Sequence, residues 1–399
     1  MKKTLAIILA AALMLFSFAA CAGETTPAPT ADPTTAAENT AFPADFKIAI
    51  IHIQDPATGN GYSYAHDQGL VGAMEALDIP ESNIIRKLNV SDGDKAATRT
   101  AIEEAIDQGA KLVFTTSFGY METTAEIAEE YPDVIFSHCS GYKSNETNFN
   151  NYFGRIYQAR YLSGIAAGLK TTTNKIGYVA AFGDTMAETS SGINSFALGV
   201  QAVNPDAEVY VKVLGAWGDE VNETAFADAL YDMDCDVIAQ HCDSANPQIS
   251  AQNNGIFGCG YNSDMTPQAP AAHLTAPIWN WTVYYTAAIE AAVDGKWVEF
   301  GNYYAGVKEG FVDVSPLSAN CAEGTQEKID AVKAILNEGT WDVFSGVKLS
   351  FDESGNVVKT DAALEDSKGN VIVEAGGASV EDGVITGTMN YYVKGVSEK

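Results

Sequence analysis

The amino-acid sequence predicts an α/β protein made of two doubly wound lobes, each built on a parallel sheet. β-rich runs alternate with segments of helical periodicity from residue 47 to about residue 260, and this pattern is typical of parallel sheets with helices on both faces. The segments 107–117 and 232–244 share one plan, in which a helix end and a turn precede a strand and small polar residues. A chain of 399 residues is long enough for two separate cores.

The strands are expected at short apolar runs, namely residues 47–51, 112–114, 134–136, 176–181, 209–213 and 237–239. Apolar residues at helical spacing predict the intervening helices around residues 70–77, 101–106, 121–128, 157–169, 193–203 and 226–233. A polar, glycine-rich loop is expected over residues 59–66, between the first strand and the first helix.

This alternation predicts how the chain divides between the lobes. We expect an N-lobe of residues 45–154 plus 279–312 and a C-lobe of residues 155–278 plus 313–348, joined by three crossings. Beyond about residue 347, short β-rich runs alternate with Gly, Asp and Asn. Residues 349–399 are therefore expected to form a β-rich appendix of hairpins or irregular structure.

The N-terminal residues predict export and a membrane anchor. A basic start and a short apolar run precede the small residues that lead to Cys21, which predicts a secretory signal over residues 1–20. The run is too short to cross about 30 Å of hydrocarbon. The cysteine directly after Phe18-Ala-Ala resembles a bacterial lipobox, so lipidation is expected at Cys21; the alternative is a plain signal with an incidental cysteine. Residues 21–44, rich in Thr, Pro and Ala, predict a disordered tether.

Composition excludes several partners. The formal charge of −29 argues against nucleic acid and against anionic lipid on the protein body, because both require basic patches. Membrane contact is therefore expected only through the lipid anchor, and the protein is expected to be a monomer. No metal or cofactor is expected, since the five histidines and six cysteines show no ligand spacing. The cysteines other than Cys21 are interpreted as buried free thiols, with one disulfide as the alternative.

The candidate binding residues follow the predicted strands. In open α/β sheets ligands bind beyond the carboxyl ends of the strands, where this chain places aromatic, acidic and amide side chains that suit a planar, uncharged, hydrogen-bonding ligand. Such rings can stack on a base, and an Asp can accept from its N–H groups. The candidates are Tyr62, His66, Phe118, Gly119, Trp217, Asp243, Asn262, Asp264, Trp279 and Trp281.

Each candidate has a structural alternative. An aromatic residue near a strand end more often packs at a lobe interface than against a ligand. Asp243 precedes Ala-Asn-Pro, so it is also a candidate helix N-cap. The short Gly59-Asn-Gly61 run is wrongly built for a phosphate-binding loop.

The sequence resembles the basic membrane protein family of lipoproteins. The resemblance runs from about residue 46 to about residue 316, and three of the blocks that carry it are Thr-Thr-Ser-Phe-Gly at 115–119, Gly-Ile-Asn-Ser-Phe at 192–196 and Asp-Val-Ile-Ala-Gln-His at 236–241. It implies a type I periplasmic-binding fold and a substrate-binding protein of an ABC importer for purine nucleosides or bases. The first and third blocks are similar to members that bind adenine-like nucleobases.

By position, Tyr62 would replace the family's stacking Phe or Trp, and Asp264 matches an acidic residue at a strand end. In nucleoside-binding members a Lys and an Asp hold the ribose, whereas Trp279 and Asn262 stand at the matching positions here. The loop over residues 182–188 is longer than usual and lacks the usual prolines. We therefore expect a nucleobase to bind better than its nucleoside, with Trp279 filling the ribose space.

Three other functions are alternatives to a component of an importer. A nucleoside-processing enzyme would need an acid–base pair such as His66 with Asp67 or His241 with Asp243, but the sequence shows no nucleophile elbow or paired-carboxylate signature. A transcription regulator would carry an N-terminal helix-turn-helix where this chain has the predicted signal and tether. A sensor lipoprotein that serves a receptor instead of an importer stays open.

Overall fold

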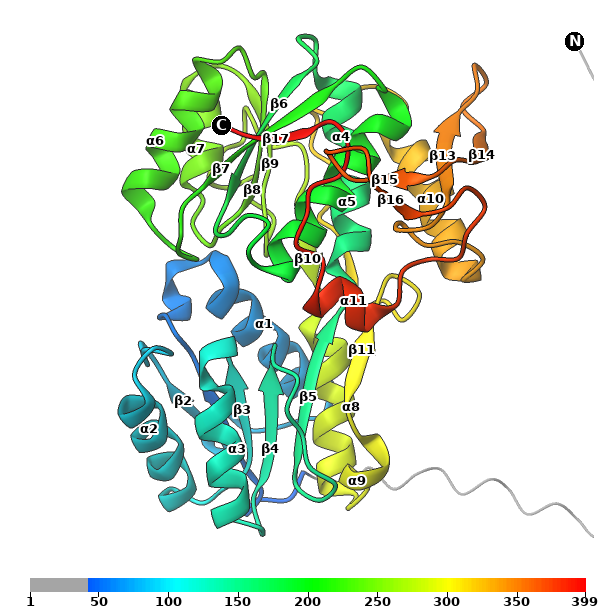
Figure 1. Cartoon of the computed structure of the whole chain (residues 1–399). Coiled ribbons are helices and arrows are strands. Elements are labelled where there is room, and N and C mark those ends of the chain that lie inside the picture. The colour runs from blue at the N-terminus through cyan, green and yellow to red at the C-terminus, as the bar shows by residue number, and fades with distance from the viewer. Residues whose placement is uncertain (1–41) are drawn as a thin grey trace, which may run out of the picture. The chain divides into compact units, whose positions relative to one another are not determined.

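The computed structural model describes residues 42–399, so the predicted signal, Cys21 and most of the tether lie outside the described residues. The described chain contains a six-stranded and a five-stranded parallel sheet, each with helices on both faces (Figure 1). The predicted α/β class with two doubly wound lobes is confirmed. We call the half built on the six-stranded sheet the N-lobe and the half built on the five-stranded sheet the C-lobe.

The N-lobe sheet has the strand order β11-β5-β4-β3-β1-β2. Its strands are β1 (Lys47–Ile51), β2 (Ile84–Lys87), β3 (Ala110–Thr116), β4 (Ile135–Cys139), β5 (Phe149–Gly154) and β11 (Tyr303–Ala305). The helices of this lobe are α1 (Gly61–Ala76), α2 (Lys95–Asp107), α3 (Met121–Glu130), α8 (Trp281–Val293) and the short α9 (Trp297–Phe300).

The period of two in β1 divides the N-lobe core between the two faces of the sheet. Ile48 and Ile50 pack with Leu70 of α1 on one face, whereas Ala49 and Ile51 pack with the residues of α2 and α3 on the other. The side chains of residues 48–51 of β1, which point to either face, are therefore apolar and buried, as expected for a strand of a parallel sheet.

The C-lobe sheet has the strand order β17-β7-β6-β8-β9. Its strands are β6 (Lys175–Ala180), β7 (Glu208–Val213), β8 (Val237–His241), β9 (Phe257–Cys259) and β17 (Val396–Glu398). Helices α4 (Ile156–Lys170) and α5 (Ala187–Val203) cover one face, and α6 (Glu220–Tyr231) and α7 (Asn246–Asn253) cover the other.

The chain passes between the two sheets after β5, between β9 and α8, and after β11. Two of these passages pair as an antiparallel ladder of β10 (Pro277–Trp279) and β12 (Val312–Val314). The residue boundaries of the two lobes stay a prediction.

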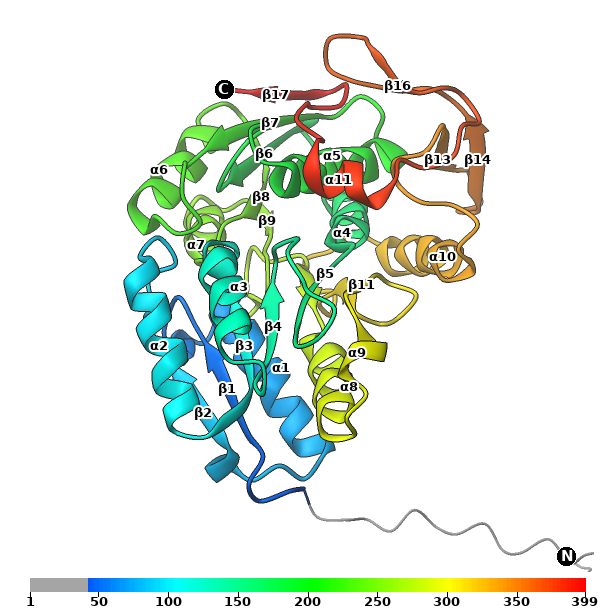
Figure 2. The same ribbon diagram turned by 60° about the horizontal axis from the view of Figure 1, so that its bottom comes forward.

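The C-terminal segment returns to the C-lobe. After α10 (Thr325–Glu338) it forms two antiparallel pairs, β13 (Val347–Phe351) with β14 (Val357–Asp361) and β15 (Leu364–Glu365) with β16 (Val371–Val373). It then passes through α11 (Asp382–Gly387), which packs on α5 (Figure 2), and ends in β17 beside β7. The segment after residue 349 therefore includes hairpins, but its last strand belongs to the main C-lobe sheet.

Two further observations bear on the expectations from the sequence. No helix between residues 42 and 399 is long and apolar enough to cross a membrane. The cysteines of the described part of the chain are free thiols, with Cys321 partly exposed and the other four buried.

Candidate functional site

The carboxyl ends of the strands in the two sheets face a common cavity of about 370 Å³. This volume includes space that is open to solvent, so it is an upper limit on the space for a bound ligand. Both lobes contribute to it, so a ligand held there would contact both. The lining residues are Ile53, Tyr62, Ser117, Phe118 and Ser140 of the N-lobe and Glu188, Trp217, Asp243 and Tyr261 of the C-lobe.

Tyr62 forms the N-lobe wall of this cavity. The expected loop over residues 59–66 is wrong from Gly61 onward, because α1 begins at Gly61 and carries Tyr62 in its first turn. Helical periodicity places Tyr62 and His66 one turn apart on the same face. The Tyr62 ring meets the His66 ring edge-on at 4.4 Å between centroids, and His66 stacks on Trp281 at 3.9 Å. His66 and Trp281 therefore hold the Tyr62 ring from behind and do not line the cavity.

Close packing of α1 on α8 fixes this arrangement. A Cβ atom at Gly69 would lie 2.2 Å from the Cβ of Trp281, so only glycine allows the two helices to approach this closely. His66 is fully buried, its Nδ1 lies 2.6 Å from the Tyr285 hydroxyl, and burial lowers its pKa well below the usual value. His66 is therefore a neutral support for Tyr62.

Phe118 lies in a short 3₁₀ helix, Phe118–Tyr120, directly after β3. Its side chain is 50% exposed and lines the cavity. The loop is held by Ser117, whose hydroxyl donates to Asp92 at 2.6 Å. Gly119 does not line the cavity; a Cβ there would lie 2.5 Å from the Asp92 carbonyl oxygen. Gly119 therefore allows the loop after β3 to lie close to the loop that carries Asp92.

Trp217 and Asp243 form part of the C-lobe wall. The Asp243 amide donates to the Trp217 carbonyl at 2.9 Å, which joins the loops after β7 and β8. The Asp243 carboxyl accepts from the Asn262 amide at 3.1 Å. It is not a helix N-cap, because α7 has Ala245 in that place with no side-chain cap. Asn262 is buried and acts on the cavity through Asp243.

The site is acidic, and burial opposes the ionisation of its carboxyls. Burial, with Glu223 and Glu188 nearby, raises the pKa of Asp243 to about 8. Burial also raises the pKa of Glu188 to about 7, although the Arg160 guanidinium opposes this shift. Charged groups lose favourable hydration on burial, so partners that donate hydrogen bonds would stabilise both carboxylates.

Sequence analysis missed Glu188 and Tyr261 as site residues. Glu188 lies in the first turn of α5, and Tyr261 follows β9. The Tyr261 ring is held by Arg160, whose guanidinium carbon lies 4.1 Å from the ring centroid. A signal for Glu188 existed, because the segment 182–188 follows the carboxyl end of β6. For Tyr261 the sequence carries no such signal, because the direction of its ring depends on packing against Arg160.

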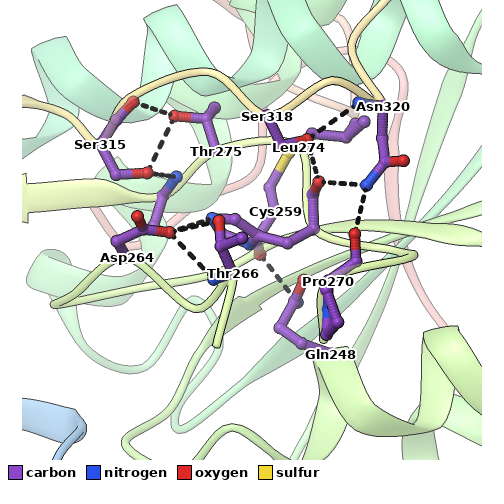
Figure 3. A network of polar contacts seen from close by, with 12 residues as sticks. Gln248, Cys259, Asp264, Thr266, Pro270, Leu274, Thr275, Ser315, Ser318 and Asn320 are labelled. Atoms are coloured by element: carbon purple, nitrogen blue, oxygen red, sulfur yellow. Dashed lines mark hydrogen bonds and ion pairs between the residues drawn. The ribbon is translucent and has the colours of Figure 1, made fainter. Parts of the chain in front are cut away.

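The remaining candidates do not line the cavity. Trp279 is 5% exposed, stacks on Trp281 at 4.6 Å and directs its Nε1 to the Tyr261 hydroxyl at 3.4 Å. Asp264 is exposed and accepts from the backbone and side chain of Thr266 at 2.9 and 2.6 Å (Figure 3). It therefore holds a local turn in a polar network with the segment that follows β12.

The described residues do not show a catalytic or metal arrangement. Between residues 42 and 399 there is no group of three or more His, Cys, Asp or Glu side chains that could hold a metal ion. Asp67 pairs with Arg86 at 2.6 Å, while His66 faces Tyr285. The ring nitrogens of His241 are buried without a hydrogen-bond partner among residues 42–399, and the pKa of the ring lies well below the usual value because of burial and Arg160.

Two parallel-sheet lobes with a cavity between their strand ends define a binding protein of the type I periplasmic-binding fold. The chain belongs to the Bmp family of PnrA-like ABC transporter substrate-binding proteins, whose model matches residues 47–340. The family resemblance inferred from the sequence is confirmed. Proteins of this family bind a small molecule and work with an ABC permease, and they are not enzymes.

Individual relatives agree with this assignment. A purine-binding protein of Brucella abortus is 34% identical over 88% of this chain and 93% of its own length. A putative ABC transporter glucose-binding protein of Haloferax volcanii is 34% identical over 72% of this chain and 71% of its own. A solved solute-binding protein from Conexibacter woesei has a TM-score of 0.60 at 19% identity, covering 74% of this chain and 98% of that one.

Proposed function

We propose that this protein captures a purine nucleobase of the adenine type in the interlobe cavity and delivers it to an ABC permease. The observation that carries the proposal is the lining itself, which combines four aromatic side chains with two carboxyls that have few hydrogen-bond partners. The purine-binding relative from Brucella abortus supports the same ligand class.

Aromatic rings and carboxyls suit a planar base for separate reasons. Stacking a base on an aromatic ring contributes about 1–3 kcal/mol, and Tyr62, Phe118 and Trp217 line the cavity from both lobes. The amino group and ring N–H groups of adenine are donors, which a carboxylate such as Asp243 can accept. A purine with oxygen at position 6 offers an acceptor there and would meet the ionised carboxyl less well.

A nucleobase is proposed over a nucleoside because the lining offers little to a ribose. The resemblance implies that nucleoside-binding members hold the ribose with a Lys and an Asp. Among the described residues that line this cavity, none is basic. Each ribose hydroxyl left unpaired after burial would cost about 1–3 kcal/mol. Trp279, which was expected to fill the ribose space, packs behind Tyr261, so its effect on the ligand would act through that ring.

The protein is further proposed to be held at the extracytoplasmic face of the cell membrane by a lipid on Cys21. The lipobox-like residues before Cys21 support this proposal, together with the membership in an extracytoplasmic family. A sensor lipoprotein that serves a receptor would use the same cavity and anchor. Labelling of intact cells with a fatty-acid analogue tests the anchor, since Cys21→Ser should abolish incorporation into this protein.

Calorimetry tests the ligand. Adenine, guanine, hypoxanthine and xanthine are titrated beside their nucleosides, and glucose is included because of the name of the Haloferax volcanii relative. Adenine is expected to bind most tightly. At a concentration a hundredfold above Kd it should raise the free energy of unfolding by about 2.7 kcal/mol. Tighter binding of the nucleosides would refute the preference for a base, and binding of glucose alone would refute the purine class.

A further inference from the structure

Glu188 stands at the boundary between the cavity and a larger groove. The groove has about 1,490 Å³ of empty space and runs along the cleft past α11. Phe118, Ser140, Glu188 and Trp217 line both spaces, whereas Asp243 lines only the cavity. A planar ligand in the cavity could therefore present one edge to Asp243 and the edge nearer the groove to Glu188.

The Glu188 carboxyl has acceptor capacity that the protein does not use. Within residues 42–399, neither a side chain nor a backbone amide donates a hydrogen bond to it, and Arg160 acts on it only through charge. Arg160 itself donates to the Tyr178 hydroxyl at 2.8 Å and to the Gln240 carbonyl at 3.1 Å. A partly buried carboxylate without a donor is costly, so a ligand that donates to it gains the full hydrogen bond.

We propose that Glu188 is a specificity-determining residue that accepts a hydrogen bond from a ring N–H that free purine bases carry and nucleosides lack. The inference rests on the proposed function, since it assumes a purine in the cavity. With the amino-bearing edge toward Asp243, the opposite edge of adenine carries its N9–H toward Glu188. In a nucleoside the sugar replaces that hydrogen, so the ring loses its donor to this carboxyl.

The charge around Glu188 is compatible with this role at mildly alkaline pH. The ionisable groups that interact with it are Arg160, Asp243, Tyr62, Cys139, Tyr261 and Tyr304. Arg160 is the one cation among these described neighbours, and it favours the ionised carboxyl. Because burial raises the pKa of Glu188 to about 7, an assay at about pH 8 keeps most of it ionised.

The test compares adenine with 9-methyladenine, which keeps the amino group and the stacking surface but has no ring N–H. In calorimetry, wild-type protein is expected to bind adenine about ten- to a hundredfold more tightly than 9-methyladenine. Glu188→Ala should weaken adenine binding by a similar factor and change 9-methyladenine binding by less than about threefold. Glu188→Gln keeps the side-chain volume and one acceptor oxygen, so its adenine loss should be smaller than that of Glu188→Ala.

Two other variants serve as references. Glu220 also lies in the first helical turn after a strand, but it is exposed and outside the cavity, so Glu220→Gln should bind both ligands as wild type does. Asp243→Asn should weaken both ligands in parallel, because both keep the amino group. Thermal unfolding checks that each variant is folded.

The possible results distinguish a failure of the role of Glu188 from a failure of purine binding. Equal affinity of wild-type protein for adenine and 9-methyladenine, or an equal loss of both ligands in Glu188→Ala and Glu188→Gln, would overturn the role of Glu188 while leaving purine binding intact. If wild-type protein binds no purine at all, the proposed function itself fails.

Discussion

Gly61 lies at a close approach of the two lobes beside the cavity, and its replacement should weaken ligand binding because the lobes can no longer close fully. Gly61 opens α1 with φ +84°, and a Cβ atom built on it would lie 2.6 Å from the Asp243 carbonyl oxygen in the opposite lobe. An ordinary contact of this kind is 3.4–4 Å. In Gly61→Ala the lobes must therefore stay apart by about 0.8 Å at this point, or the loops must distort.

The size of the effect follows from two separate costs. A positive φ at alanine costs about 1–2 kcal/mol whether the lobes are open or closed, so it lowers the free energy of unfolding but not the affinity. The steric overlap exists only when the lobes meet, and overpacking of this kind costs about 1–3 kcal/mol. Since about 1.4 kcal/mol is tenfold in affinity, the dissociation constant should rise about five- to 150-fold.

Gly59 provides a matched control. It has φ +76°, and no atom of residues 42–399 lies within 4 Å of a Cβ built there, so Gly59→Ala carries the backbone cost without the overlap. Both variants should unfold at lower temperature than wild type, but only Gly61→Ala should bind adenine more weakly in calorimetry and compact less in solution scattering when ligand is added. If the two variants bind adenine equally well, closure through Gly61 and Asp243 is refuted.

Three other predictions follow from the same structure. Because the folded-state pKa of Asp243 is raised to about 8, the unliganded folded protein holds a proton that the unfolded chain releases near pH 4, so stability should fall as pH rises from about 4 to about 8. Thermal unfolding of Asp243→Asn across this range should show a smaller loss than wild type; an equal loss would contradict the raised pKa. Trp217→Ala should weaken adenine binding about five- to 150-fold by loss of stacking or cavity wall, while Tyr142→Ala, which changes an exposed ring of the groove alone, should have little effect in the same titration. Deletion of residues 396–399 should uncover the β7 edge and promote aggregation, measured by light scattering; a monodisperse truncated protein would show that β17 does not protect this edge.

The central strands were predictable because their signal is local. β1, β3, β4, β6, β7 and β8 are apolar runs bounded by turns, and each was expected within a few residues of its observed position. Among the strands that were missed, β2 with Ile-Ile-Arg-Lys and β5 with Phe-Asn-Asn-Tyr-Phe-Gly lie at or next to a sheet edge and carry polar residues. Their conformation is stabilised by pairing with strands distant in sequence, which no local window contains.

The loops that form the site were also predictable, but the direction of each side chain was not. The rule that ligands bind at the carboxyl ends of parallel strands requires only the order of elements, and it selected Tyr62, Phe118, Trp217 and Asp243, which the structure brings around one cavity. The same rule selected Trp279 and Asp264, which the structure places elsewhere. Proximity to a strand end does not determine the direction of a side chain.

The sequence by itself therefore determined the two-lobed α/β class, the family and the loops that surround the site, because periodicity and motif order are local properties of the chain. Only the tertiary structure decided which side of each loop faces the cavity. Tyr62 faces it because His66 and Trp281 fill the space behind, and Tyr261 faces it because the buried guanidinium of Arg160 occupies its other side. The contacts of Trp281 with His66 and of Arg160 with Tyr261 join residues more than 100 positions apart, and close packing leaves each ring a single place.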